Sequence, residues 1–191
     1  MPSPRRLAAL LAAALAAAGL SACNHPDKDA AVVRAETEGL YLDIGELKYQ
    51  VQVSRVLNPY DTQDKSLLVG LPADQRELAP DEVWFAVFLR VQNETARAQL
   101  PSADIEIADT QEEVFKPVAL APSNVYAYRS SDEIPAGDVL PLRDSAAFNT
   151  PAQGALLLFK LDNATLDNRP LELKIVSRVP PQQTGLIDLD V

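Results

Sequence analysis

The chain has very few of the side chains on which most enzymes and metal proteins depend. It contains one cysteine, one histidine and one methionine, which are Cys23, His25 and Met1. A single cysteine cannot form an intramolecular disulfide, so the fold must be stabilised by packing. With one imidazole near the start of the chain, no Ser-His-Asp or Cys-His arrangement can be assembled in the rest of it. Zinc and copper sites lack ligands for the same reason, and we expect no cofactor.

Basic residues are also scarce, because 17 Lys and Arg stand against 27 Asp and Glu, a formal charge of −10. An acidic surface repels phosphate backbones, so we expect no nucleic-acid partner. It also disfavours adsorption to anionic lipid, which would limit membrane contact to an anchor. Hydrophobic residues make up 47% of the chain. That content excludes the composition of a disordered protein and allows a packed core.

The start of the sequence has the pattern of a bacterial lipoprotein signal. Arg5 and Arg6 precede an apolar stretch of Ala and Leu over residues 7–18. At about 12 residues this stretch is too short to cross a bilayer, and it fits the apolar region of a helical signal peptide. The residues that follow resemble a lipobox: Leu20, Ser21, Ala22 and Cys23. We therefore predict cleavage after residue 22 and lipidation of Cys23. The alternative is an ordinary signal peptide followed by a chance cysteine.

This interpretation divides the chain into three parts. Residues 1–22 are the signal peptide, residues 23–38 are the lipidated cysteine and a flexible tether, and residues 39–191 form one domain. A short helix over residues 29–38 is the alternative to a flexible tether. Two acyl chains give stable anchoring, so we expect the domain to be held on the outer face of the cell membrane or at the outer membrane.

From residue 39 onward, apolar residues recur with the period of two that is typical of strands. Leu47, Tyr49, Val51 and Val53 alternate with polar residues, which predicts a strand with one wet face. Residues 82–93 are apolar on both faces, which predicts a central strand. We expect further strands at 105–107, 114–115, 155–161, 171–175 and 186–191, a long loop at 62–81, and loop and edge in the proline-rich segment 117–151. These patterns predict an all-β sandwich or barrel.

Three stretches of the chain resemble a known family. They are residues 53–58, the apolar stretch 84–94 with its polar Asn-x-Thr ending at Asn93, and residues 105–110 followed by Val114 and Phe115. They are similar to bacterial lipoproteins that carry an immunoglobulin-like sandwich of uncharacterised function, related in fold to a secreted mycobacterial antigen. The resemblance implies an immunoglobulin-like β-sandwich of about seven strands and an extracytoplasmic location. It implies no activity.

One aromatic cluster is a candidate contact patch. Tyr126, Tyr128 and Arg129 stand together in the proline-rich segment, and Tyr and Arg are typical anchors of protein interfaces. We therefore predict that these three residues contact a partner, which we expect to be another envelope protein. The alternative is that one tyrosine plugs the end of the sandwich and the other is exposed.

Acidic residues on two loops are candidates for binding Ca²⁺, although neither loop has the Asp-x-Asp-x-Asp-Gly order of a calcium loop. They are Asp61 and Asp64 on one loop, and Asp132, Glu133 and Asp138 on the other. The sequence thus leaves three hypotheses. The first is a non-catalytic binding or structural module of the cell envelope, the second a protein that binds Ca²⁺ or a small solute, and the third a hydrolase with an unrecognised carboxylate or serine site. The absence of His and Cys from the domain favours the first.

Overall fold

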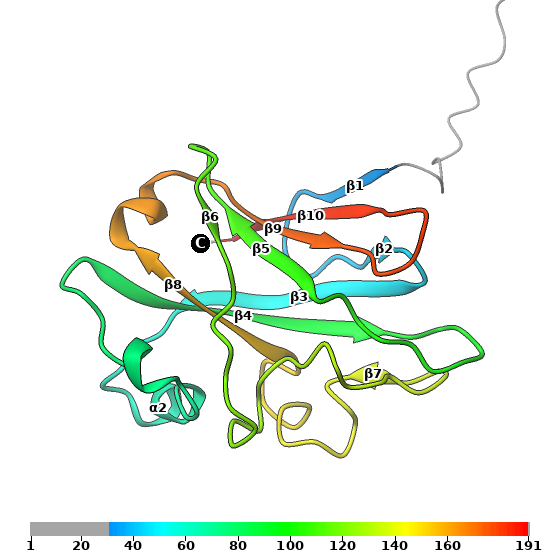
Figure 1. Ribbon diagram of the computed structural model, residues 1–191, viewed down its shortest axis with the longest axis horizontal. Helices are drawn as coiled ribbons and strands as arrows, with labels where there is room; N and C mark the ends of the chain where they lie inside the picture. Colours follow the sequence, from blue (N-terminus) through cyan, green and yellow to red (C-terminus); the bar gives the residue numbers. More distant parts are fainter. Residues whose placement is uncertain (1–30, 191) are drawn as a thin grey trace, which may run out of the picture.

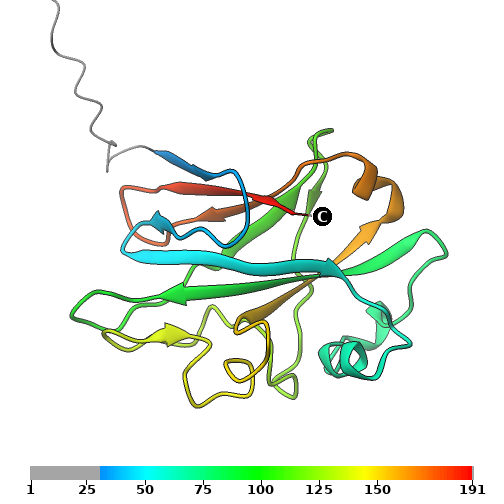
Figure 2. The ribbon, with the colours of Figure 1, turned by 180° about the vertical axis from the view of Figure 1, so that it is seen from behind.

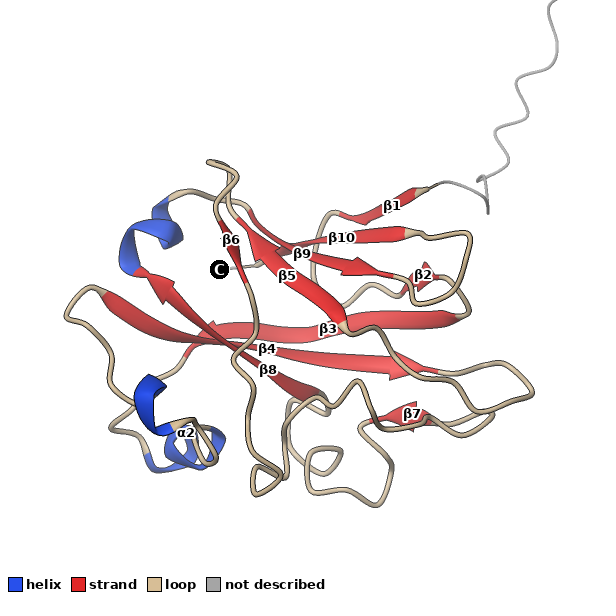
Figure 3. Cartoon of the chain, viewed as in Figure 1, coloured by secondary structure: helices blue, strands red, loops and turns tan. Residues whose placement is uncertain are grey.

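A computed structural model describes residues 31–190, and this part of the chain forms two stacked β-sheets with one short α-helix (Figure 1, Figure 3). The strands are β1 (Val32–Ala35), β2 (Leu42–Ile44), β3 (Leu47–Val56), β4 (Glu82–Gln92), β5 (Asp104–Ala108), β6 (Val114–Phe115), β7 (Val139–Leu140), β8 (Ala155–Asp162), β9 (Leu171–Val176) and β10 (Thr184–Leu189). The helix is α2 (Thr62–Leu67), and 3₁₀ turns form at Ala73–Gln75 and Asn163–Asp167.

The first sheet has the strand order β1-β10-β9-β5-β6, and the second has the order β2-β3-β4. Both β7 and β8 pair with the other side of β4, β8 along most of its length and β7 at its end. All of these pairings are antiparallel except β1 with β10. The two sheets face each other, as the view from behind also shows (Figure 2). The buried cluster between them, which we call the main core, includes Val51, Phe85, Val87, Leu89, Leu157, Phe159, Leu173 and Ile175. The prediction of an all-β, immunoglobulin-like sandwich is confirmed in this two-sheet architecture.

The prediction that residues 82–93 form a central strand is confirmed, because β4 pairs with strands on both sides and both of its faces are buried. Phe85 and Leu89 of β4 point into the main core between the sheets, and both are fully buried. Trp84 and Phe88 point to the opposite face of the same sheet, where they are 1% and 5% exposed. A sheet in a two-layer sandwich normally leaves that outer face wet. Here a third layer must cover it.

The third layer consists of α2 and the irregular segments on either side of β4 and β8. In Figure 1 it lies below β3, β4 and β8, on the side away from the first sheet. Its apolar side chains and those of the outer sheet face form a second cluster, which we call the outer core: Leu57, Leu67, Leu71, Trp84, Ala86, Phe88, Leu156 and Leu158, with Val53, Val118, Leu120 and Tyr126 packed against them. The proline-rich segment, predicted as loop and edge, therefore also serves as a cover.

The predicted boundary between tether and domain, at residue 39, is wrong. β1 lies within the segment predicted to be flexible, and it pairs in parallel with β10 from Val32 to Ala35. Ala35 is buried in the main core. Glu38 accepts hydrogen bonds from the amide and hydroxyl of Ser54. Residues 32–38 thus belong to the sandwich, and the helix considered for residues 29–38 does not form over residues 32–35.

A β-bulge in β3 changes which of its side chains face the main core. Val51 pairs with Leu89 and Val53 pairs with Phe88, so two steps along β3 match one step along β4. A bulge re-aims the side chains that follow it. The sequence places Val53 on the same face as Val51, but Val53 packs in the outer core instead, and Ser54 is buried in its place.

Two further expectations need correction in detail. Residues 31–190 form ten strands where about seven were expected, because β1, β2 and β7 add short pairings. The long loop expected at 62–81 contains α2 and a 3₁₀ turn. Leu67 of α2 is 7% exposed in the outer core, so the helix forms where it can cover the sheet.

The outer core predicts a large effect for a substitution on a face that is wet in most sandwiches. Leu158 of β8 is fully buried there. We expect Leu158→Ala to lower the free energy of unfolding by about 2–5 kcal/mol, as for a core leucine. Val125→Ala, at a side chain 60% exposed, is expected to change it by less than about 0.5 kcal/mol. Urea unfolding measures both, and equal small effects would show that the third layer does not pack as described.

Candidate functional site

The outer face of the second sheet carries a cleft of about 480 Å³ between β3, α2 and the loop before β8. Its volume falls within the range of small-ligand and side-chain pockets, about 300–1,000 Å³. The apolar part of its lining is Val53, Leu67, Phe88, Tyr126, Pro151 and Ala152. Arg55, Gln63, Ser66 and Thr150 supply the polar part. The cleft can therefore accept an apolar group and offer hydrogen bonds beside it.

Two carboxylates shape one side of this cleft, because one caps α2 and the other holds the helix against the sheet. Asp61 caps the helix, and its Oδ1 accepts hydrogen bonds from the amides of Gln63 and Asp64, at 2.8 and 3.1 Å. Asp64 is 5% exposed, and its carboxylate accepts hydrogen bonds from both terminal nitrogens of Arg55 and from the amide of Asn58. The hydrogen bonds from Arg55 lower the pKa of Asp64 and raise that of Arg55. The bulge makes this pair possible, since it turns Arg55 to the outer face.

The same hydrogen bonds engage two of the carboxylates that the sequence suggested as Ca²⁺ ligands. Asp61 and Asp64 serve the helix cap and the ion pair. On the other loop, Asp138 pairs with Arg143 at 3.1 Å, and Asp132 lies 3.3 Å from the hydroxyl of the neighbouring serine. Nowhere in residues 31–190 do three His, Cys, Asp or Glu side chains form a group that could hold a metal ion. The calcium hypothesis gains no support from this geometry.

A second hollow, of about 460 Å³, lies between β5, the segment that follows β6, and residues 127–131. We call it the edge groove. Its ionisable lining residues are Asp104, Lys116, Tyr128 and Arg129, and backbone and small side chains form most of the rest. Its lining is more polar than that of the cleft, although large apolar residues also contribute to it: Ile105, Val118, Leu120, Leu156 and Leu157.

The structure divides the predicted contact patch between the two hollows. Tyr126 lines the cleft, whereas Tyr128 and Arg129 line the edge groove. Tyr128 packs against the main core, and its hydroxyl donates to the carbonyl of Ser102 at 2.7 Å. Burial raises the pKa of Tyr128 well above its ordinary value. Arg129 donates to the carbonyl of Ala121 at 2.9 Å. Of the three residues, Tyr126 is therefore the one placed to meet a ligand in the cleft.

A second tyrosine holds the same loop residue from the other side. Tyr49 of β3 is 2% exposed, and its hydroxyl accepts a hydrogen bond from the amide of Ser102 at 2.9 Å. Burial raises the pKa of Tyr49 to about 12. Both phenols thus stay protonated at neutral pH and bind the two backbone groups of Ser102. This pair closes one end of the main core and is structural.

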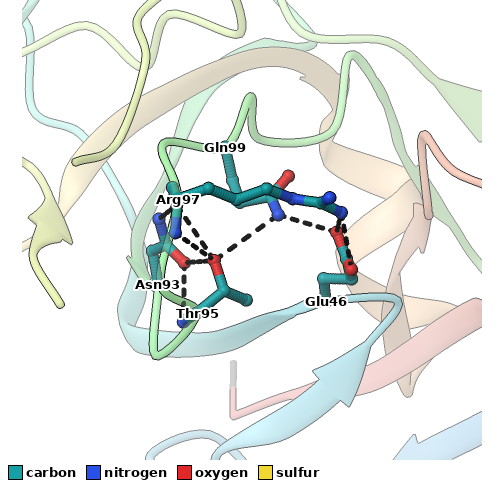
Figure 4. Close-up of polar contacts among 5 residues, drawn as sticks. All are labelled: Glu46, Asn93, Thr95, Arg97 and Gln99. Carbon is teal, nitrogen blue, oxygen red and sulfur yellow. Dashed lines mark hydrogen bonds and ion pairs between the residues drawn. The ribbon is translucent and has the colours of Figure 1, made fainter. Parts of the chain in front are cut away.

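A polar cluster joins the β2–β3 hairpin to the loop that follows β4 (Figure 4). Arg97 donates to both carboxylate oxygens of Glu46, at 2.8 and 2.6 Å, and Gln99 donates to the same carboxylate at 2.7 Å. The hydrogen bond from Arg97 lowers the pKa of Glu46. Asn93 is fully buried, and its Oδ1 accepts from the amide and hydroxyl of Thr95. The Asn-x-Thr ending of the central strand is thus a turn motif.

One cation beside the cleft gave no signal in the sequence. Arg90 follows Phe88 by two residues on the same face of β4, which places the two about 7 Å apart. Its guanidinium lies over the ring of Phe148, 5.5 Å from the ring centre. Its buried Nε has no hydrogen-bond partner within the described part of the chain. Because Phe148 comes from a distant loop, no local pattern could reveal this contact.

The predicted lipidation site lies outside the described residues. This applies to Cys23 and to Leu20, Ser21 and Ala22 of the lipobox. The structure shows instead where the chain reaches the sandwich, because β1 begins at Val32. Residues 24–31 are then all that separates Cys23 from the first sheet. Between residues 31 and 190, no helix has the length and apolar character needed to cross a bilayer.

Comparisons with known proteins find similarity only among solved structures. No family model matches the chain, and no curated protein matches it significantly. A functionally unknown protein from Listeria monocytogenes EGD-e has 14% sequence identity and a TM-score of 0.50, covering 82% of this chain and 84% of that one. An uncharacterized β-sandwich protein from Clostridium difficile 630 has 10% identity and a TM-score of 0.46, covering 87% and 100%. YcdA of Bacillus subtilis, named a candidate lipoprotein, has 13% identity and a TM-score of 0.41, covering 81% and 39%.

These likenesses concern the fold. At such low identity, a shared sandwich carries no activity or ligand from one protein to another. The Listeria protein supports the two-sheet architecture described above. The relation to a secreted mycobacterial antigen, which the sequence pattern indicated, is not shown by these comparisons.

The Arg55–Asp64 pair predicts a pH dependence of stability. Because the pKa of Asp64 is lowered in the folded protein, the pair stabilises the fold above the unfolded value of about 3.9. That stability is lost as pH falls through the lower folded pKa. We expect Asp64→Asn to be less stable than the wild type at pH 7, and the difference to shrink toward pH 2. Urea unfolding at several pH values tests this. The control Asp74→Asn, at an exposed carboxylate outside the ion pairs of residues 31–190, should keep the wild-type profile.

Proposed function

We propose that the protein is an extracytoplasmic lipoprotein, anchored through lipidated Cys23, whose sandwich is a non-catalytic binding module of the cell envelope. The observation that carries the anchor is the position of the only cysteine in the chain, directly after Leu20, Ser21 and Ala22. The start of β1 at Val32 supports it, because a folded domain follows the lipidation site within a few residues.

The lining of the cleft supports binding in preference to catalysis. Its ionisable residues are Arg55 and Tyr126, and the guanidinium of Arg55 is engaged by Asp64. General acid–base chemistry most often uses an imidazole, a carboxylate or an amine within hydrogen-bond reach of the substrate. The residues that line the cleft include none of these three, and the phenol of Tyr126 is the remaining ionisable group. The edge groove does contain a carboxylate and an amine, those of Asp104 and Lys116. Turnover of esters or phosphate esters by the purified protein would therefore contradict the proposal that the module is non-catalytic.

The partner that the cleft fits best is a segment of another envelope protein. An apolar side chain of that segment would enter between Val53, Phe88 and Leu67. A polar group next to it would meet Gln63, Ser66 and Thr150, which supply the polar lining of the cleft. The cleft is lined by residues of α2, and this helix lies at the lower left of Figure 1, whereas β1 lies at the upper right. An anchor that joins the domain at β1 would therefore leave the cleft accessible to a partner.

The anchor is tested by Cys23→Ser in the native host. We expect the wild-type protein to incorporate labelled fatty acid and to enter the detergent-rich phase on Triton X-114 partition. Cys23→Ser should do neither, because the thiol that takes the diacylglycerol is gone. A Cys23→Ser protein that still partitions with detergent would contradict the proposal, and its secretion into the soluble envelope fraction is the control for export.

The cleft is tested by photo-crosslinking from defined positions in native membranes. A benzoylphenylalanine at Ala152, which lines the cleft, is expected to give a discrete adduct with one envelope protein. The same residue at Val114, which is 49% exposed on the other sheet, is the matched control and should give none. Adding Gln63→Ala, at an exposed residue that lines the cleft, to the Ala152 probe should weaken the adduct. Equal adducts from both probes, or none from either, would contradict a partner in the cleft.

A further inference from the structure

Four segments meet at the end of the sandwich where the chain enters β1, and we call this the anchor end. It consists of Val32, the hairpin turn 45–46, the loop 93–103 and the loop 177–183. Val32 pairs with Thr184. The amide of Gly45 donates to the side chain of Gln183 at 2.7 Å. Arg178 donates to the carbonyl of Pro101 at 2.7 Å. These contacts bind the segments into one rigid surface.

The anchor end exposes three apolar side chains, two of which share one hollow. Leu100 and Val179 are 38% and 39% exposed and line the same shallow hollow, and Val32 is 55% exposed. The tip of the loop, residues 178–182, is exposed throughout and includes two prolines after Val179. Apolar residues gathered on an exposed surface mark an interaction site more often than scattered ones.

Most of the charge around these side chains is neutralised locally. Glu46 pairs with Arg97, and Glu94 pairs with Lys48. Arg178 donates to backbone carbonyls of Pro101 and Ser130 and remains a cation at the tip. This surface is therefore better suited to contact lipid phosphate groups than the rest of the acidic protein is. Ile134 forms a β-bridge with Gln99 of the loop 93–103, so the exposed residues Asp132 and Glu133 that precede Ile134 lie near the anchor end. Their negative charges disfavour contact with a strongly anionic lipid surface.

The chain outside the sandwich is too short to hold this end far from a bilayer. Residues 24–31 span at most about 30 Å when fully extended. β4 alone, with its 11 residues, is about 37 Å long. The loops next to Val32 are thus the part of the domain kept nearest to the lipid on Cys23.

We propose that the anchor end rests in the headgroup layer of a zwitterionic bilayer, with Leu100 and Val179 as its apolar contacts. This inference rests on the proposed anchor at Cys23, and it adds an orientation. The loops 93–103 and 177–183 contact lipid, and the cleft beside α2 faces away from the membrane. It also differs from the expectation that the lipid anchor is the only membrane contact.

The test places a reporter at single positions of the full-length lipidated protein, reconstituted in phosphatidylcholine vesicles. The acylated Cys23 leaves no other thiol, so an introduced cysteine is labelled uniquely with an environment-sensitive dye. Leu100→Cys and Val179→Cys probe the anchor end. Val114→Cys and Val125→Cys, at side chains 49% and 60% exposed, are controls away from it. Flotation of the vesicles first shows that each protein is anchored.

We expect dyes at residues 100 and 179 to shift to shorter emission wavelengths and to be quenched at least about twofold more by brominated lipid than the controls, as for groups buried about 5–10 Å into the interface. The difference should shrink in phosphatidylglycerol vesicles. Proteins that float but show equal quenching at all four positions would overturn this inference and leave the proposed anchor standing. Lipidated protein that does not float would overturn both. Because residues 100 and 179 are probed in separate proteins, local misfolding caused by one substitution would not affect the result at the other.

Discussion

The rest of the structure depends on the burial of both faces of β4. Phe85 and Leu89 on one face and Trp84 and Phe88 on the other are nearly inaccessible to solvent. Leaving either set exposed would cost roughly 2 kcal/mol for each large side chain. The first sheet covers one face and completes the sandwich. Nothing in a two-layer sandwich covers the other, so α2 and the proline-rich segment are recruited to it. The third layer is thus a consequence of the sequence of a single strand.

The bulge in β3 makes the third layer specific. It turns Val53 and Arg55 to the outer face, where one adds to the outer core and the other pairs with Asp64 of α2. A buried carboxylate without a partner is costly, so α2 is confined to the place where Asp64 meets Arg55. The cleft forms because the helix is fixed there and does not close over Phe88 completely. The cleft thus follows from the contacts that stabilise the cover.

Strands could be predicted where burial and period agree, and the errors arise where they do not. The alternation of Leu171, Leu173 and Ile175 with polar residues predicts β9 correctly. The four residues of β1 are flanked by charge and show no period, since a short edge strand takes its pairing from β10 rather than from its own pattern. The bulge left no mark in the sequence, so Val53 was placed on the wrong face. The pairs Arg55–Asp64 and Arg90–Phe148 depend on tertiary contacts that no local pattern encodes.

The anchor and the cleft constrain each other through the direction of the strands. β3 runs from the anchor end toward α2, and β4 returns, so side chains late in β3 lie far from the start of β1. The proposed anchor at Cys23 would therefore hold the polar cluster of Glu46 and Arg97 near the bilayer and leave the cleft on the side away from it. Under the proposed anchoring, residues 24–31 would limit the distance of the anchor end from the bilayer to about 30 Å, and the proposed partner of the cleft would have to lie within reach of a domain held at that distance. Shortening or lengthening that segment changes which partners are in reach without altering the cleft.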